Sequence, residues 1–182
     1  MARTSASAGA PAGVGRHAPR RAAGAAGGFD AAAREILVPD PATMAALGAA
    51  LAGVARPGDM LCLFGDLGAG KTALAKGFAA GLGVRDIVAS PSFVLMAEYQ
   101  GRLPLFHIDL YRLADGAAAI SGGLLDEREA DGVTLIEWAD RLGAGLPAAR
   151  LDVRIDGTGD DPRTVRLAPT DAGHARYLEA IP

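Results

Sequence analysis

Short apolar runs alternate with segments of helical character along the chain from residue 35 onward. The runs that predict β-strands cover residues 36–38, 60–64, 93–99, 103–109, 133–137, 151–155 and 164–167. An apolar run without alternation is typical of a strand buried on both faces, whereas 151–155 and 164–167 alternate more clearly. The pattern predicts an α/β fold in which helices cover a mostly parallel sheet.

Helix signals lie between these runs. Asp40 can cap a helix that Pro41 opens and that runs to about Ala55, where Pro-Gly-Asp at 57–59 supplies turn residues. A second helix is expected over residues 73–83 and a closing helix over 171–180. Residues 114–123 are small and glycine-rich, which predicts a loop or a frayed helix.

Two pairs of strands are close enough in sequence to form antiparallel hairpins. Gln-Gly-Arg at 100–102 joins the runs 93–99 and 103–109, and residues 157–162 join 151–155 to 164–167. We therefore expect antiparallel additions to the parallel sheet.

The length and composition predict one folded domain. A chain of 182 residues with 50% hydrophobic residues can bury a single core, although alanine supplies much of that percentage. We assign residues 30–182 to the domain, without internal repeats. The single cysteine, Cys62, lies inside an apolar run, so it is expected to be a buried thiol, as in a reducing cytoplasm.

Residues 1–29 differ in composition from the rest, because they are rich in Ala, Gly, Ser and Pro, contain arginines and lack acidic residues. They resemble a transit peptide only superficially, since glycine and proline oppose an amphipathic helix. We interpret them as a disordered, low-complexity tail or the product of an upstream start codon. No apolar stretch is long enough to span a bilayer, which predicts a soluble protein without a membrane partner. Together with the expected free thiol of Cys62, this favours a cytoplasmic location.

Residues 65–72 carry the most specific motif, Gly-x-x-x-x-Gly-Lys-Thr, between an apolar run and a helical segment. The motif consists of Gly65, Asp66, Leu67, Gly68, Ala69, Gly70, Lys71 and Thr72. Its glycines let successive N–H groups face phosphate oxygens at the start of a helix. Lys71 is expected to reach the β- and γ-phosphates, and the Thr72 hydroxyl to ligate Mg²⁺. The alternative, a glycine-rich turn that binds no ligand, would not explain why Lys71 and Thr72 directly follow the last glycine.

Two acidic residues end apolar runs where an enzyme with a phosphate loop needs carboxylates. Asp109 follows 103–108 and Glu137 follows 133–136, which places both at the carboxyl ends of strands. We expect one to lie near Mg²⁺ and the other to orient the nucleophile. The alternatives are a cap or solvent-exposed group for Asp109 and an ion pair with Arg141 for Glu137.

The segment Ser-Pro-Ser at 90–92 falls where a nucleotide-sensing loop is expected, and Ser92 is the candidate that contacts the γ-phosphate or the metal. An ordinary turn is the alternative. His107 lies two residues before Asp109, and a core histidine is favoured over a catalytic one. Tyr111, Arg112 and Trp138 suit either packing at the sheet edge or contact with a partner.

These motifs, taken in order, resemble the bacterial TsaE family of small ATPases, which are required to make threonylcarbamoyladenosine on tRNA. The resemblance covers about residues 36–167. It rests on the phosphate loop, Ser-Pro-Ser-Phe at 90–93, Glu-Tyr at 98–99, His-Ile-Asp-Leu-Tyr-Arg-Leu at 107–113 and Ile-Glu-Trp at 136–138. The combination is specific, whereas a phosphate loop alone is common.

The resemblance implies that Thr72 and Glu137 hold Mg²⁺, that Asp109 matches an acid needed for hydrolysis, and that Trp138 lies beside the ATP site. It also implies that the loop around Pro41 lies near the nucleotide base. The implied partners are TsaD, which transfers the threonylcarbamoyl group, and TsaB, which supports it. Ser92 stands where threonine is frequent, and residues 117–121 replace a stretch usually richer in acids.

Net charge supports an indirect relation to RNA. The formal net charge is −3 and the sequence pI is about 5.6, so the chain lacks the basic surface that binds nucleic acid directly. The leading interpretation is an ATPase that drives or resets a tRNA-modifying assembly. The alternatives are a small-molecule kinase, although no lid-like module is visible, and a non-hydrolysing nucleotide-dependent interaction module. A GTP switch is disfavoured because the chain contains no asparagine for guanine recognition.

Overall fold

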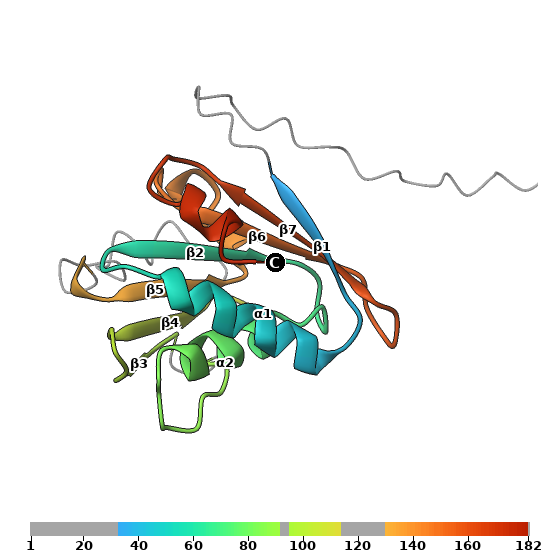
Figure 1. Ribbon diagram of the computed structural model, residues 1–182, viewed down its shortest axis with the longest axis horizontal. Coiled ribbons are helices and arrows are strands. Elements are labelled where there is room, and N and C mark those ends of the chain that lie inside the picture. The colour runs from blue at the N-terminus through green and yellow to red at the C-terminus, as the bar shows by residue number, and fades with distance from the viewer. Residues whose placement is uncertain (1–32, 92–94, 114–129, 182) are drawn as a thin grey trace, which may run out of the picture.

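The computed structural model describes residues 33–91, 95–113 and 130–181 (Figure 1). Their strands form one seven-stranded sheet with the order β1-β7-β6-β2-β5-β4-β3. The strands are β1 Arg34–Val38, β2 Asp59–Phe64, β3 Met96–Tyr99, β4 Leu105–Asp109, β5 Val133–Glu137, β6 Leu151–Asp156 and β7 Arg163–Pro169.

The parallel strands occupy the centre of the sheet. β2 pairs in parallel with β5 and β6, and β5 pairs in parallel with β4. β3 adds antiparallel to β4, β7 adds antiparallel to β6, and β1 adds antiparallel to β7. The predicted α/β class, the parallel core and both hairpins are confirmed.

Two helices cover one face of the sheet (Figure 1). They are α1, Pro41–Val54, and α2, Lys71–Gly81, and they lie side by side over a large apolar core. Glycines make this close packing possible, because a Cβ atom at Gly48 would collide with the Leu74 carbonyl and one at Gly77 with the Ala45 backbone. The contact positions α1 against the helix that starts at the phosphate loop.

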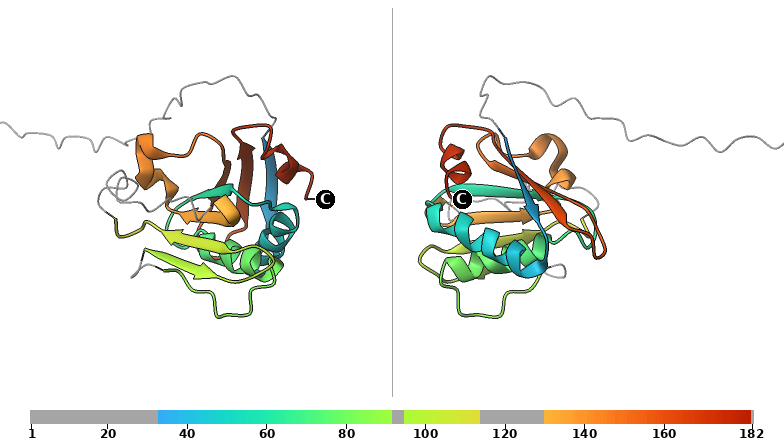
Figure 2. Two further views of the ribbon diagram at one scale, coloured as in Figure 1. Left: turned by 90° about the vertical axis from the view of Figure 1, so that its left-hand side faces the viewer. Right: turned by 45° about the vertical axis from the view of Figure 1, so that its right-hand side comes forward.

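The other face of the sheet carries a smaller apolar cluster. The 3₁₀ segment η2, Ala139–Gly145, lies on this side, opposite α1 and α2 (Figure 2). The cluster includes Cys62, Ile108 and Leu142, and the Cys62 side chain is buried as expected. Burial raises the pKa of the Cys62 thiol to about 12, so the thiol stays protonated at neutral pH.

The start of α1 follows the predicted capping chemistry. Asp40 is the N-cap, and its carboxylate accepts a 2.7 Å hydrogen bond from the Thr43 backbone N–H. Pro41 occupies the first helical position, where a missing N–H costs nothing.

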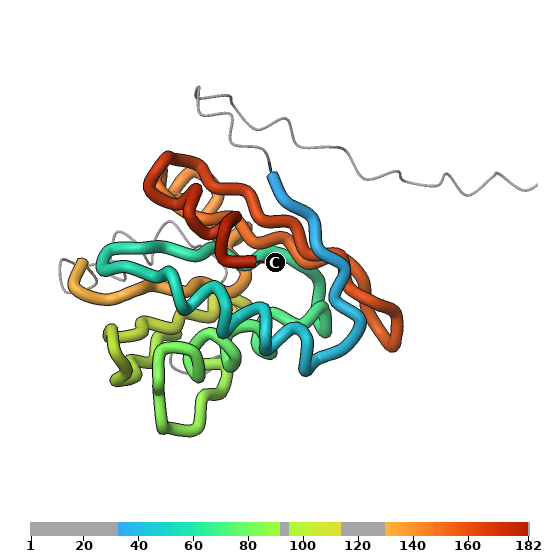
Figure 3. Tube along the Cα trace, viewed as in Figure 1, coloured from blue at the N-terminus to red at the C-terminus, as the bar shows by residue number. Residues whose placement is uncertain are grey.

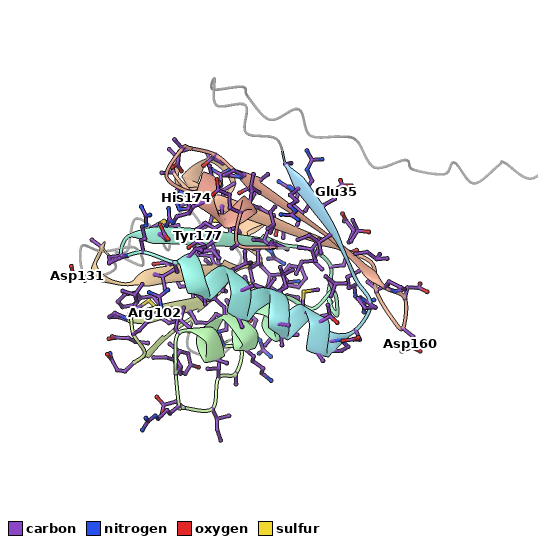
Figure 4. The ribbon with its side chains drawn as sticks, in the orientation of Figure 1. Glu35, Arg102, Asp131, Asp160, His174 and Tyr177 are labelled. Atoms are coloured by element: carbon purple, nitrogen blue, oxygen red, sulfur yellow. The ribbon has the colours of Figure 1, made fainter. Side chains whose placement is uncertain are left out.

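The predicted closing helix over residues 171–180 is wrong. Only the short 3₁₀ turn η3, Ala175–Leu178, forms there, and the tube in Figure 3 turns back tightly at this end of the chain. The Asp171 carboxylate accepts bonds from the N–H groups of Gly173, at 2.7 Å, and His174, at 3.2 Å, which closes a turn instead of a helix. The Tyr177 hydroxyl donates a 2.6 Å bond to the buried Asp59 carboxylate at the start of β2. His174 and Tyr177 both lie against this end of β2 (Figure 4).

Several expectations lie outside the described residues. They concern the tail at 1–29, the loop or frayed helix at 114–123 and Ser92. The domain assignment also stays a prediction. None of the helices in the described ranges combines the length and apolar composition that crossing a bilayer requires.

Candidate active site

The phosphate loop connects β2 to α2 in a conformation that its glycines allow. Gly65, Gly68 and Gly70 have φ values of 146°, 79° and 113°, in the region that L-residues with side chains rarely adopt. Gly70 is also the N-cap of α2 and has no side chain that could occupy the N–H groups of the first turn. These N–H groups, together with the helix dipole, suit an anion.

Lys71 folds back onto its own loop. Its ammonium donates to the carbonyls of Gly65, at 2.6 Å, and Asp66, at 2.8 Å, and lies 3.6 Å from the centre of the Trp138 ring. Burial lowers the pKa of Lys71, while the charges of Glu137 and Asp109 act in the opposite direction. The two backbone carbonyls therefore hold the Lys71 ammonium beside the loop, and a bound phosphate could attract it away from them.

Thr72, Glu137 and His107 form a continuous chain of contacts. The Thr72 hydroxyl donates to Glu137 Oε2 at 2.9 Å, and His107 Nε2 lies 2.9 Å from Glu137 Oε1. Both His107 and Glu137 are buried. The alternative to a metal role for Glu137, an ion pair with Arg141, is not seen in the ranges that the structure describes, and Arg141 donates to the Leu113 carbonyl. His107 is thus a core histidine, as favoured, but one that fixes the orientation of a carboxylate.

The remaining ring nitrogen supports one tautomer for His107. Its Nδ1 atom is buried and has no hydrogen-bond partner within the described part of the chain. A proton on Nδ1 would leave an unsatisfied buried donor, whereas a proton on Nε2 is accepted by Glu137. The geometry therefore favours a proton on Nε2.

Asp109 lies directly opposite Glu137 in the register of β4 and β5. The residue is 5% exposed, and its carboxylate accepts a 2.8 Å bond from the Tyr111 N–H and is contacted by the Ser90 hydroxyl. Both acids therefore end buried strands at the same edge of the sheet, as predicted. The alternative that Asp109 is merely a solvent-exposed group is wrong.

A pocket of about 250 Å³ collects these side chains, and we call it the phosphate pocket. It is lined by Leu67, Gly68, Gly70, Lys71, Thr72, Ala73, Ser90, Asp109, Tyr111, Glu137 and Trp138. Among these, the ring centroids of Tyr111 and Trp138 lie 4.9 Å apart, and Tyr111 is 39% exposed. The three predicted catalytic residues, Lys71, Asp109 and Glu137, thus line one cavity.

A second pocket of about 320 Å³ adjoins the phosphate loop, and we call it the side pocket. Pro41 and Met44 line it from α1, and the β6–β7 turn lines it from the opposite wall. The two pockets share Gly68, Gly70 and Ala73, so a ligand could extend from one into the other. Of the predicted nucleotide contacts, Gly65 and Asp66 line neither pocket and border a third hollow beside Trp138.

Sequence reasoning missed two residues of this region. Ser90 belongs to the segment that was singled out, but its contact with the Asp109 carboxylate is not signalled by any pattern in the sequence. Arg163 reaches the phosphate loop from β7, where its sequence neighbours predict only a strand. Nothing in the sequence signals that approach.

The residues present fit a magnesium ion bound together with phosphates. A hydroxyl oxygen of Thr72 and a carboxylate oxygen of Glu137 converge at 2.9 Å, and hard oxygen donors are those that Mg²⁺ prefers. No group of three His, Cys, Asp or Glu side chains that could hold a metal occurs among residues 33–91, 95–113 and 130–181. Mg²⁺ in phosphate-loop proteins commonly takes few protein ligands, so two are sufficient.

Comparison with known proteins gives a consistent family. The family model described as "Threonylcarbamoyl adenosine biosynthesis protein TsaE" matches residues 38–165. The chain is 45% identical over 143 residues to the tRNA threonylcarbamoyladenosine biosynthesis protein TsaE of Bacillus subtilis (strain 168), covering 78% of this chain and 89% of the relative. It is 38% identical over 111 residues to the protein of the same name from Treponema pallidum (strain Nichols), covering 61% and 82%.

A solved structure agrees with this result. The crystal structure of YdiB from Bacillus subtilis superposes with a TM-score of 0.67 and 36% sequence identity. The match covers 81% of this chain and 92% of the other.

Proposed function

The chain belongs to the TsaE family, and on that premise we propose that it binds and hydrolyses ATP, with Mg²⁺, as a component of the machinery that makes threonylcarbamoyladenosine on tRNA. One observation carries the proposal. Lys71 and Thr72 of α2, Asp109 of β4 and Glu137 of β5 converge from three separate elements on the phosphate pocket at the carboxyl edge of the parallel strands.

Binding would begin with the phosphates on the loop and the start of α2. The N–H groups of the first turn would donate to the phosphate oxygens, and Lys71 would leave the carbonyls of Gly65 and Asp66 to reach the β- and γ-phosphates. The base would occupy the side pocket, where Pro41 offers apolar contact.

Thr72 and Glu137 would hold Mg²⁺, which neutralises charge that develops on the phosphates. His107 has a supporting part in this scheme, because its Nε2–H holds one carboxylate oxygen of Glu137 and leaves the other toward Thr72. The carboxylate therefore needs little reorganisation when the metal binds.

Asp109 is the candidate group that orients or activates the attacking water. Its carboxylate borders the phosphate pocket, and the Tyr111 N–H and the Ser90 hydroxyl restrict its orientation. A fixed carboxylate at this place can accept a proton from water as the phosphoryl group departs.

Removing either oxygen ligand should chiefly damage the metal-dependent part of binding. Thr72→Ala and Glu137→Ala are expected to weaken ATP binding in Mg²⁺ by about tenfold, and to change it little in EDTA. Titration calorimetry in both buffers measures the difference. Thr72→Ser keeps the hydroxyl and is the matched control. Equal losses with and without Mg²⁺ would place both residues in support of the fold.

We further propose that the ATPase works with TsaD and TsaB and meets tRNA only through them. The net charge of −3 supports weak intrinsic RNA binding. Tyr111 and Arg112 are exposed, and the Tyr111 ring lies tilted against Trp138, which itself contacts Lys71. A partner bound to these side chains would therefore act directly on the ATP site.

Adding the two partners should accelerate hydrolysis. We expect the wild-type chain with TsaB and TsaD to release phosphate faster, by about tenfold, than the isolated chain. Arg112→Ala should reduce this stimulation, whereas Arg85→Ala, an exposed arginine away from the site, should not. Trp138→Ala tests the ring contact with Lys71, and Trp138→Phe retains a ring.

Two results together would contradict the proposed coupling between partner binding and ATP hydrolysis. The first is a wild-type hydrolysis rate that does not change when TsaB and TsaD are added. The second is tRNA modification that proceeds through repeated cycles without this chain. A kinase would then be identified by phosphate transfer to a small-molecule acceptor. A passive module would show nucleotide-dependent partner binding without hydrolysis.

A further inference from the structure

Arg163 connects the β6–β7 turn to the phosphate loop. It is the first residue of β7, and its guanidinium donates only to backbone carbonyls in the contacts that the structure describes. Nε donates to the Ala69 carbonyl at 3.2 Å, and one terminal nitrogen lies 2.7 Å from the Gly159 carbonyl and 3.5 Å from that of Gly68. The other terminal nitrogen contacts the Asp161 carbonyl. One side chain thus joins two loops that are about 90 residues apart in sequence.

Holding these carbonyls also sets the direction of the N–H groups. A trans peptide unit is planar, with its C=O and N–H pointing in opposite directions. The Ala69 carbonyl shares its peptide plane with the Gly70 N–H, so a donor that fixes the carbonyl aims that N–H away from Arg163. Gly70 borders the phosphate pocket and is the N-cap of α2.

The loop needs such an external restraint. Gly68 and Gly70 are both in the left-handed region, and glycine also populates many other conformations. Within the loop, the Ala69 N–H donates to the Asp66 carbonyl at 3.1 Å. Arg163 adds a restraint from outside the loop at the adjacent peptide.

The same residue shapes the side pocket. Arg163 lines it together with Gly159, Asp160 and Asp161 of the β6–β7 turn. Asp160 marks the tip of this turn, which extends beyond the sheet near the start of α1 (Figure 4). The wall of the side pocket and the phosphate loop are therefore connected by one guanidinium.

We infer that Arg163 is a positioning residue of the phosphate site, which holds the peptide units of the loop in their phosphate-binding orientation. The inference rests on the proposed nucleotide site but concerns a property of the ligand-free loop as well. Loss of a residue that only contacts the base would weaken binding of ATP alone. Loss of a residue that positions the loop weakens binding of every ligand that carries the phosphate chain.

The test compares Arg163→Ala and Arg163→Lys with Arg166→Ala, which removes an exposed arginine from the same strand. ATP and inorganic tripolyphosphate are the two probes, each measured by calorimetry. Arg163→Ala should weaken both by about tenfold, and Arg163→Lys should weaken both partially because lysine lacks the planar fork. Arg166→Ala should match the wild type.

A second measurement needs no nucleotide. Hydrogen exchange at the amides of residues 68–70 in the ligand-free protein should accelerate in Arg163→Ala and not in Arg166→Ala. Unchanged exchange, or weaker ATP binding with unchanged tripolyphosphate binding, would overturn the positioning role. If the wild type bound neither probe, the proposed function would fail, while the exchange result would still decide the role of Arg163 in the loop.

Discussion

Replacing Lys71 by alanine is expected to weaken ATP binding by at least about tenfold and to reduce turnover by about 10³-fold. The chain contains one other lysine, Lys76, which is exposed on α2 five residues further along. No second ammonium group can therefore replace Lys71 at the β- and γ-phosphates. In the ligand-free protein Lys71 is already buried and interacts electrostatically with Glu137, so its loss also removes a positive charge that acts on the proposed metal ligand.

Calorimetry with ATP and phosphate release, both in Mg²⁺, measure the two effects. Lys76→Ala is the matched control, because it removes the same charge from an exposed position on the same helix. An alanine variant at position 71 with wild-type affinity and wild-type turnover would rule out the phosphate site as described.

Asp109→Asn should separate binding from chemistry. The amide has nearly the same shape but no negative charge, so ATP should bind with similar affinity while hydrolysis falls by about 10²-fold or more. A 10²-fold loss corresponds to about 2.7 kcal/mol of transition-state stabilisation. The burial of Asp109 and its contacts with Ser90 and Tyr111 make large rearrangement in the variant unfavourable.

Single-turnover hydrolysis, started with saturating ATP, measures this loss without interference from product release. Asp86→Asn, an exposed acid in the loop after α2, controls for the change in net charge. Wild-type turnover in Asp109→Asn would remove Asp109 from the chemistry. A loss confined to ATP affinity would assign it to binding.

Local patterns in the sequence predicted most of the elements. The cap at Asp40, the proline at the first position of α1 and the turn residues of both hairpins act over a few neighbours, and so they are readable without the fold. The same holds for the phosphate loop, whose glycines and lysine carry their conformational and chemical properties within eight consecutive residues. The strand ends at Asp109 and Glu137 also follow from where apolar runs stop.

Contacts between distant segments were decided only by the tertiary structure. The closing segment forms a 3₁₀ turn because Asp171 bonds nearby N–H groups and Tyr177 reaches Asp59, more than 100 residues away. The approach of Arg163 to Ala69 and the contact of Ser90 with Asp109 depend on sheet order and on the path of loops. The sequence by itself thus determined the phosphate loop and the strands that lead to the acids, since these properties are local. The residues that contact the two acids and the phosphate loop, such as His107, Ser90 and Arg163, come from other segments, so their positions depend on the packing of the whole sheet.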